Sequence, residues 1–256
     1  MKTAALETTG VKYELKREIG QYGDPNQDPW LICIGGIHGN EFAGVAAIQR
    51  VFQKLQQAHI PMHGNFIGIA GNLQALSKGQ RYLRKDLNRM WVPERIDRLQ
   101  DGPINGEFKL AEDREQAELF ERLERILQPA NRRLYFLDLH TTSSHSAPFA
   151  IFGDTLRNRR FARHFPVPLI LGLEEVLDGV LIEYLTNLGH IAMAFEGGQH
   201  EAPESVDRLE AAIWIALMNA GLVRSTDVPR AGQYDRLLAQ ACKGLPHVSE
   251  VVYRHE

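Results

Sequence analysis

Residues 30–57 read WLICIGGIHGNEFAGVAAIQRVFQKLQQ, and this stretch decides the class of fold. Trp30–Ile37 is almost entirely apolar, which is typical of a strand buried on both faces of a sheet. Phe42–Gln57 follows with apolar residues at helical spacing, which predicts an amphipathic helix packed on that sheet. Between them lie His38 and Glu41, in a turn with several glycines. The stretch therefore predicts strand, tight turn and helix, with a histidine and a carboxylate in the turn.

The rest of the chain repeats this alternation of short apolar segments and longer helical patterns. Further strands are predicted at Asn65–Gly71, Arg133–Leu139, Ala147–Phe152, Val167–Gly172 and His190–Phe195, and further helices at Glu112–Leu127, Leu156–His164, Val180–Leu188 and Ser205–Ala220. Ser205 is the expected cap of the last helix. Strands that alternate with helices favour a largely parallel sheet covered on both sides. Ligands of such sheets bind beyond the carboxyl ends of the strands, so polar residues at those ends are the first candidates for a site.

The composition is that of an ordinary globular protein. The 256 residues suit one large α/β domain, and the net charge of −3 gives no reason to expect binding to nucleic acid or to an anionic membrane. No segment approaches the roughly 18 consecutive apolar residues of a membrane span. The N-terminus lacks the apolar core of a signal peptide. With two cysteines, Cys33 and Cys242, no disulfide framework is expected, and the cytoplasm is the predicted location.

Two segments depart from the alternation of strands and helices. Tyr82–Gly106 is charged, contains two prolines and shows little apolar periodicity, so we expect a long loop that is either functional or disordered. Leu245–Glu256 follows a Gly-Leu-Pro break and alternates like the first strand of another unit. We therefore predict one domain over residues 1–244 and the start of a second, absent or truncated, domain over residues 245–256.

Histidines or carboxylates stand directly after three of the predicted strands. They are His38, Glu41, His140 and Glu196. Two histidines and one carboxylate form a usual ligand set for catalytic zinc, with a fourth position left for water. Zinc lowers the pKa of that water from about 16 to roughly 7, and a further carboxylate can act on it as general base. If the three strands are neighbours in the sheet, the four side chains converge on one site.

Each of these motifs also has an ordinary structural interpretation. A single His-x-x-Glu is common, and Glu196 with the two glycines after it is compatible with a plain turn. Asp138 either supports His140 from behind or is a buried strand residue directed away from it. A serine hydrolase is disfavoured because Ser143 and Ser144 do not lie in a G-x-S-x-G elbow.

Four motifs, GIHGNEFAG, RYLRKDLNRMW, LDLHTT and FEGGQ, occur in this order within residues 30–199. Together they resemble the succinylglutamate desuccinylase/aspartoacylase family of zinc-carboxypeptidase-like metal amidohydrolases. The resemblance implies one Zn²⁺ per chain, held by His38, Glu41 and His140, with Glu196 as general base and acid. It also implies a three-layer α/β/α fold around a mixed, mostly parallel twisted sheet. The predicted domains then become a catalytic domain (1–244) and the start of a C-terminal β domain (245–256).

The resemblance also gives roles to residues of RYLRKDLNR. It implies that Arg81 polarises the scissile carbonyl, and that Asn88 and Arg89 hold the carboxylate of the amino-acid part of the substrate. These roles suit the side chains, because a guanidinium presents a planar fork to a carboxylate and a fixed cation stabilises an oxyanion.

One position departs from the family pattern. Aspartoacylases carry an arginine ten residues before the general base, where it reads the carboxylate of the acyl chain. Thr186 occupies that position here. The acyl group is therefore open, and the arginines that could replace the missing one are Arg157, Arg159 and Arg160.

The leading hypothesis is zinc-dependent hydrolysis of the amide bond of an N-acyl amino acid, a linear amide rather than a peptide bond. A metal-bound water would attack the carbonyl, with Glu196 passing the proton to the leaving amine. Two alternatives stay open: a carboxypeptidase-like peptidase acting on short peptides, and a zinc-binding module without turnover. The expected partner is a small molecule, and a homo-oligomer is compatible with the sequence.

Overall fold

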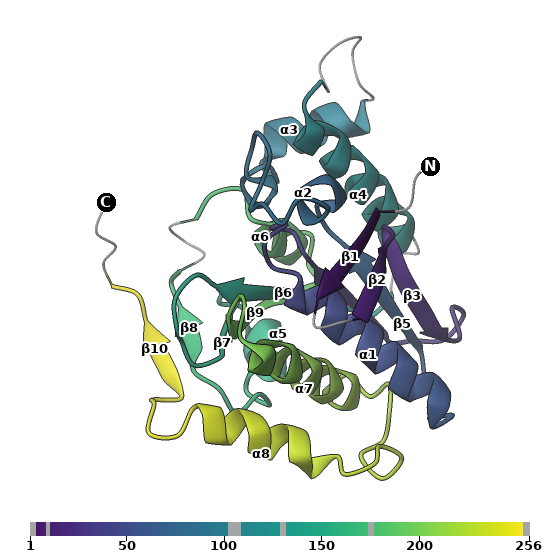
Figure 1. Ribbon diagram of the computed structural model, residues 1–256, viewed down its shortest axis with the longest axis vertical. Coiled ribbons are helices and arrows are strands. Elements are labelled where there is room, and N and C mark those ends of the chain that lie inside the picture. The colour runs from purple at the N-terminus through teal and green to yellow at the C-terminus, as the bar shows by residue number, and fades with distance from the viewer. Residues whose placement is uncertain (1–3, 9–10, 102–108, 129–131, 174–176, 253–256) are drawn as a thin grey trace.

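The computed structural model describes residues 4–8, 11–101, 109–128, 132–173 and 177–252. Its centre is an eight-stranded sheet in the order β10-β8-β7-β9-β6-β4-β5-β3 (Figure 1). The strands of this sheet are β3 Glu18–Gly23, β4 Trp30–Gly35, β5 Asn65–Ala70, β6 Leu134–Thr142, β7 Phe149–Ile151, β8 Leu169–Leu171, β9 Ile191–Gln199 and β10 Val248–Glu250. A separate hairpin pairs β1 Ala4–Thr8 with β2 Val11–Leu15 in antiparallel register.

The sheet is mixed and mostly parallel, as predicted. The pairs β10·β8, β8·β7, β9·β6, β6·β4 and β4·β5 are parallel, whereas β7·β9 and β3·β5 are antiparallel. The three strands that precede the candidate ligands, β4, β6 and β9, are consecutive neighbours in the sheet. The adjacency on which the zinc hypothesis depends is therefore present.

Helices cover both faces of the sheet, which gives the three-layer α/β/α architecture. Their bounds are α1 Ala43–Gln57, α2 Leu73–Leu76, α3 Pro93–Gln100, α4 Ala111–Leu127, α5 Leu156–Ala162, α6 Leu181–Asn187, α7 Pro203–Asn219 and α8 Gly232–Ala241, with a 3₁₀ turn at Leu87–Arg89. One core cluster joins the sheet to α1, α5, α7 and α8, and the other joins it to α3, α4 and α6. None of the described helices has both the length and the apolar character that a membrane span requires.

Strand β4 shows why the sequence folds in this way. Successive side chains of a strand point to opposite faces. Leu31 and Cys33 accordingly enter the cluster under α1, while Ile32 and Ile34 enter the cluster on the other face. All four are fully buried, so only a sheet covered on both sides accommodates this run.

Several sequence-based boundaries are wrong, each for a physical reason. The segment Tyr82–Gly106 is not one long loop, because Pro93 begins helix α3 and Ile96 anchors it in the core. Residues 102–106 of that segment lie outside the described residues. Ser205 is not a helix cap, since α7 begins two residues earlier with Ala202 at the cap position. Instead, its hydroxyl donates a hydrogen bond to the carbonyl of Gln199 at 2.6 Å.

The end of the described chain forms an edge strand of the main sheet. Val248–Glu250 forms β10, which pairs in parallel with β8 at the sheet edge. Residues 253–256 lie outside the described part of the structure. The boundary at residue 244 and the C-terminal β domain stay predictions.

Gly39 makes the turn after β4 possible, which leads to a first prediction. A Cβ on Gly39 would lie 2.1 Å from the carbonyl carbon of Ala75 and 2.4 Å from the amide nitrogen of Leu76. Because these are backbone atoms, they cannot move aside as a flexible side chain can. We expect Gly39→Ala to lower the free energy of unfolding by about 3 kcal/mol or more, measured by chemical denaturation.

The matched control for Gly39→Ala is Gly232→Ala in α8. There the added Cβ would meet only the end of the Arg236 side chain, at 3.2 Å. We expect a change within about 0.5 kcal/mol at this position. Equal effects of the two substitutions would contradict the view that the turn is held against α2.

Candidate active site

The sheet register brings the candidate ligands to one edge. Gly35, the last residue of β4, is level with Leu139 of β6, and His140 is level with Glu196 of β9. After Gly35 the chain turns through Gly36, which has a φ of +74°. This left-handed conformation favours glycine. The turn places His38 and Glu41 over the ends of the neighbouring strands.

Strands β6 and β9 extend further than the sequence indicates. His140 and Glu196 lie within these strands rather than after them, because pairing continues to Thr142 and Gln199. The register shifts between His140 and Thr142, so the ladder is irregular at the site itself. The two functional side chains are thus fixed on strands rather than on loops.

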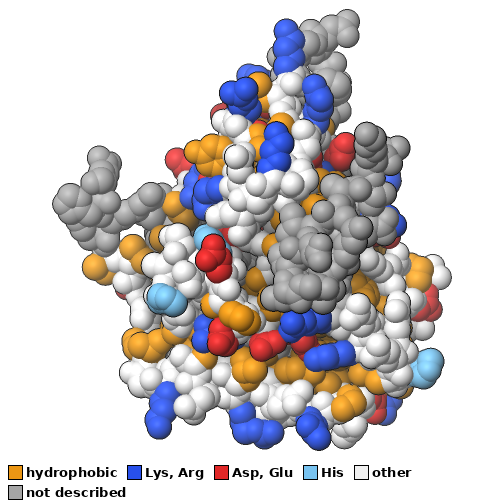
Figure 2. Space-filling model, viewed as in Figure 1, with side chains coloured by type: hydrophobic (Ala, Val, Ile, Leu, Met, Phe, Trp, Pro, Cys, Tyr) orange, Lys and Arg blue, Asp and Glu red, His pale blue; other side chains and the backbone are white. Residues whose placement is uncertain are grey.

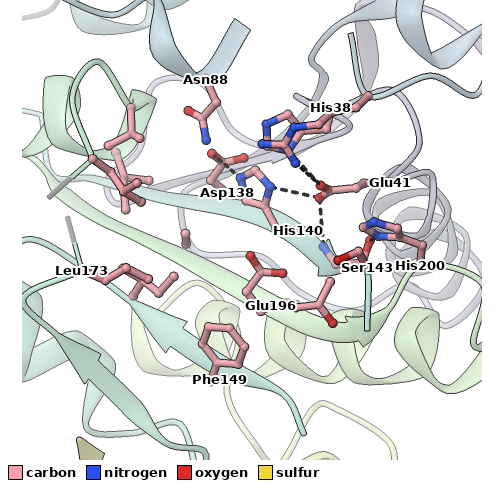
Figure 3. A pocket seen from close by; sticks show the side chains of 18 of the residues that line it. His38, Glu41, Asn88, Asp138, His140, Ser143, Phe149, Leu173, Glu196 and His200 are labelled. Atoms are coloured by element: carbon pink, nitrogen blue, oxygen red, sulfur yellow. Dashed lines mark hydrogen bonds and ion pairs between the residues drawn. The ribbon is translucent and has the colours of Figure 1, made fainter. Parts of the chain in front are cut away.

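His38, Glu41 and His140 form one buried group whose ligand atoms all lie within 4.8 Å of one another. Nδ1 of His38 is 2.8 Å from Oε1 of Glu41, and Nδ1 of His140 is 3.0 Å from Oε2 of the same carboxylate. Figure 3 shows both rings directed at this carboxylate. The backbone N–H of Thr141 also donates to Oε2, at 2.9 Å. The carboxylate is thereby held between the two imidazoles.

Two further carboxylates, of Asp86 and Asp138, lie behind the two imidazole rings. Nε2 of His38 is 3.1 Å from Oδ1 of Asp86, and Nε2 of His140 is 2.9 Å from Oδ2 of Asp138. Of the two interpretations of Asp138, the structure selects the one in which it supports His140. Residues two apart in a strand share a face, which explains the contact. A proton on each Nε2 would face a carboxylate and leave the Nδ1 lone pair for a metal.

The protonation of the group reflects this concentration of carboxylates. Burial by itself lowers the pKa of His140, but Asp138 and Glu41 outweigh it and raise that pKa well above its usual value. Burial by itself raises the pKa of Glu41, but His140 and His38 hold it far below its usual range. The surrounding carboxylates therefore favour positive charge at this position, which protons or a metal ion can supply.

Glu196 is placed differently from Glu41 and Asp86, whose carboxylates accept backbone hydrogen bonds. Its Oε2 is buried and has no hydrogen-bond partner among the described residues. Burial raises the pKa of Glu196 to about 7, with His140 opposing the shift. A carboxyl group with a pKa near neutrality can both accept and donate a proton at neutral pH. Its position suits a general base and acid better than a structural role.

These side chains line a cavity of about 390 Å³. The residues predicted for the site all line it: His38, Glu41, Arg81, Asn88, Arg89, His140 and Glu196. Asp138 and Thr141 line it as well. The structure thus brings together every predicted site residue from segments far apart in the sequence.

The segment between α2 and α3 supplies the cationic side of the cavity. Nη2 of Arg81 donates to Oδ2 of Asp86 at 2.9 Å, and its Nη1 lies 3.9 Å from Oε1 of Glu41. Arg89 donates to the carbonyl of Asn88 at 2.7 Å. Figure 2 shows lysine and arginine side chains gathered over α2, α3 and the segment between them. This surface attracts an anionic ligand toward the cavity.

Asp86 is the functional candidate that the sequence analysis missed. Its carboxylate contacts His38 through one oxygen and Arg81 through the other, and Oδ1 also accepts from the backbone N–H of Asn88. The available signal was its place inside RYLRKDLNR, two residues before Asn88. Its neighbours Arg84 and Lys85 make the segment look like an ordinary solvated charge run.

Comparison with known proteins now decides the family. The model of the succinylglutamate desuccinylase/aspartoacylase catalytic domain matches residues 27–214. The chain belongs to this family. The resemblance carried by the four motifs is thereby confirmed.

Similar proteins include succinylglutamate desuccinylases of Photorhabdus laumondii and Pseudomonas fluorescens. The first is 31% identical over 137 residues, which cover 53% of this chain and 40% of that protein. The second is 28% identical over 174 residues, which cover 67% of this chain and 48% of that protein. The matched region thus spans about half or less of the length of these relatives.

Solved structures of low sequence identity share the fold. The product-bound ectoine utilization protein EutE (DoeB) from Ruegeria pomeroyi superimposes with a TM-score of 0.59 at 18% identity, covering 77% of this chain and 59% of that one. The succinylglutamate desuccinylase from Chromobacterium violaceum gives a TM-score of 0.56 at 19% identity, covering 78% of this chain and 63% of that one.

The acyl-binding arginine of the aspartoacylase pattern has no substitute among the three candidates. Thr186 is buried against Asn158 and does not line the cavity. Nη2 of Arg157 donates to the carbonyl of Thr186 at 2.7 Å, and Arg159 pairs with Asp154. Arg160 lines a different cavity, together with Arg157. Neither Thr186 nor any of these three arginines therefore supplies a cation to the described lining of the cavity.

The contact between Asp138 and His140 supports a second prediction. We expect Asp138→Asn to weaken metal affinity about 10- to 100-fold. The reason is that a neutral amide orients the His140 ring less strongly than the carboxylate does. Metal affinity would be measured by competition with a chelator of known strength. The control is Asp154→Asn, whose carboxylate pairs with Arg159 away from the cavity. Unchanged affinity in Asp138→Asn would show that this carboxylate does not support the ligand.

Proposed function

We propose that the protein is a zinc-dependent deacylase that hydrolyses the amide bond of an N-acyl amino acid, with Glu196 as general base and acid. The observation that supports this most strongly is the convergence of a buried His-Glu-His group with an unpartnered, buried carboxylate oxygen in one cavity. Family membership supports the same reaction class.

The donor set fits zinc. Two imidazole nitrogens and one carboxylate are among the usual three-residue sets of catalytic zinc sites, whereas Ca²⁺ and Mg²⁺ prefer oxygen ligands alone. The outer carboxylates of Asp86 and Asp138 would fix the rings with Nδ1 toward the ion. The backbone N–H of Thr141 fixes Glu41 in the same way. His38, Glu41 and His140 would therefore hold the ion.

A bound zinc ion would supply Lewis acidity, which lowers the pKa of water and polarises a carbonyl group. Glu196 would take a proton from the attacking water and deliver it to the nitrogen of the leaving amine. Its pKa of about 7 suits both transfers, because neither protonation state is strongly favoured at neutral pH. The absence of a hydrogen-bond partner on Oε2 among the described residues leaves that oxygen available to water.

The cationic residues would orient the substrate. Arg81 stands beside Glu41 and would stabilise negative charge that develops on the carbonyl oxygen. Asp86 positions it, since the same carboxylate also contacts His38. Arg89 and Asn88 would bind the carboxylate of the amino-acid part, with the guanidinium forming paired hydrogen bonds.

The proposal is tested by incubating zinc-loaded protein with a panel of N-acyl amino acids and measuring release of the free amine. We expect hydrolysis of at least one compound with a free α-carboxylate, and none of its methyl ester. Hydrolysis of dipeptides alone would indicate a peptidase. Stoichiometric zinc with no hydrolysis of either panel would indicate a binding module and would overturn the proposal.

A further inference from the structure

The cavity has two chemically different ends. Arg81 lies at the end with the candidate metal ligands, beside Glu41 and Asp86, and Nη1 of Arg89 donates to the carbonyl of Asn88. The other end is formed by apolar side chains of β7, α6 and the segment before α6, namely Phe149, Ile151, Leu173, Leu177, Val180 and Ile182. Figure 3 shows Glu196 between His140 and Phe149, with Leu173 to one side. A substrate whose amide lies at Glu196 would therefore place its two halves in different surroundings.

The apolar end is an open edge of the hydrophobic core. Ile151, Val180 and Ile182 belong to the core cluster on this face of the sheet, and Phe149 and Leu173 pack against it. Val180 and Ile182 are each 5% exposed, so they offer a firm wall rather than mobile surface groups. Such a lining binds apolar groups by removing their surface from water.

Among the described residues that line the cavity, the cations Arg81 and Arg89 contact Glu41, Asp86 and the carbonyl of Asn88 rather than the apolar side chains. The sequence contains neither lysine nor arginine from His164 to Asp207, a range that includes α6 and β9. Arg157 is held by the carbonyls of Thr186 and His190, and it lines another cavity. The charged group beside the apolar end is Glu196, which is level with Phe149 in the ladder between β7 and β9.

These surroundings disfavour a second carboxylate on the substrate. A carboxylate placed there would lose hydration without gaining a cationic partner, which is costly. It would also lie near Glu196, and like charges at short distance disfavour the ionised form of both. Burial of an aliphatic or aromatic group at this end is favourable, because it removes apolar surface from water.

We propose that this end of the cavity binds an uncharged, apolar acyl group, and that acyl groups with a terminal carboxylate, such as succinyl, are poor substrates. The inference rests on the proposed deacylase function and specifies its substrate class. The substrate is an amino acid with its α-carboxylate at the arginine end and an aliphatic or aromatic acyl group at the Phe149 end.

The test uses three series of compounds, based on glycine, alanine and glutamate. Within each series the amino acid is constant and the acyl group is acetyl, hexanoyl, benzoyl or succinyl, and zinc-loaded protein is assayed with each compound. Each buried methylene contributes about fourfold to binding. We therefore expect kcat/KM for hexanoyl or benzoyl to exceed that for succinyl by tenfold or more. An equal or higher value for succinyl would overturn the inference.

Substitution at Ile182 gives a more direct test. Ile182→Arg places a guanidinium at the apolar end, so we expect it to raise kcat/KM for succinyl and lower it for hexanoyl, reversing the preference. Leu188→Arg is the control, because Leu188 is 48% exposed at the end of α6 and does not line the cavity. We expect it to leave the preference unchanged. If Ile182→Arg does not fold, Ile182→Ala should reduce the advantage of hexanoyl over acetyl, and an undiminished advantage would count against the inference.

A binding measurement separates this inference from the proposed function. Failure of every N-acyl amino acid to be hydrolysed would overturn the proposed function. The cavity would then be tested by titrating zinc-loaded Glu196→Gln with N-hexanoylglycine and N-succinylglycine in a calorimeter. Tighter binding of the hexanoyl compound would support the apolar end, and equal or weaker binding would overturn it.

Discussion

Replacing Glu196 with glutamine is expected to lower kcat by about 10²- to 10⁴-fold, the usual contribution of a general acid or base. Glutamine keeps the size of the side chain but cannot exchange a proton. Because Glu196 is not one of the grouped ligand residues, zinc content should stay at about one ion per chain. Kinetics and elemental analysis of the same sample would check both parts.

The pH profile gives this prediction a second readout. Burial raises the pKa of Glu196 to about 7, and a general base acts only when deprotonated. Bound zinc stabilises the carboxylate and lowers this pKa, so the kcat/KM of the zinc-loaded protein should rise with pH and level off below pH 7. Glu196→Gln should lack this rise altogether.

The control for Glu196→Gln is Glu201→Gln, an exposed position that does not line the cavity. It should retain both the rate and the pH profile. If Glu196→Gln kept a rate within a few-fold of the original, another group would have to transfer the proton, and the assignment of Glu196 would be wrong.

Loss of one histidine ligand should remove most of the bound zinc. We expect His38→Ala and His140→Ala each to reduce zinc from about one ion per chain to a trace, because two remaining ligands hold the ion poorly. Activity should fall to background in both. Zinc should also raise the unfolding temperature of the unsubstituted protein but not that of the variants, since a ligand stabilises only a fold that binds it.

His145→Ala serves as the control for the two ligand substitutions. His145 lies close to His140 in the sequence, but it is exposed and does not line the cavity. It should retain zinc, activity and the thermal response. Unchanged zinc content in His38→Ala and His140→Ala would mean that the ion binds elsewhere, and the site assignment would be rejected.

The convergence of His38, Glu41, His140 and Glu196 could be predicted because its signals are local. A fully buried strand followed by an amphipathic helix indicates a covered sheet, and residues at strand ends meet when the strands are neighbours. These patterns were sufficient to select the four residues as candidates for one site. The residue types alone suggested a zinc site with a further carboxylate as general base. The family resemblance assigned Glu41 to the metal and Glu196 to the base, and it named the amide substrate.

Other features depend on contacts that a local pattern does not contain. Asp86 is 48 residues from its partner His38, and its neighbours hide it in a charged run. The ends of β6 and β9 were placed too early because polar residues and glycines end the apolar run after Leu139 and Phe195, yet mutual pairing extends both strands through the site. The chemistry of the acyl end depends on α6, β7 and the segment between them, none of which carries a motif.

Asn88 connects the two ends of the cavity. Its Oδ1 accepts a hydrogen bond from the backbone N–H of Leu181 at 2.9 Å, at the first residue of α6. The N–H of Trp91 donates to the carbonyl of Gly179 at 3.0 Å. The wall that would bind the carboxylate is thus fastened to the wall that would bind the acyl group. A shift of one wall would therefore displace the other, and we expect substitutions at Arg89 and Ile182 to combine non-additively.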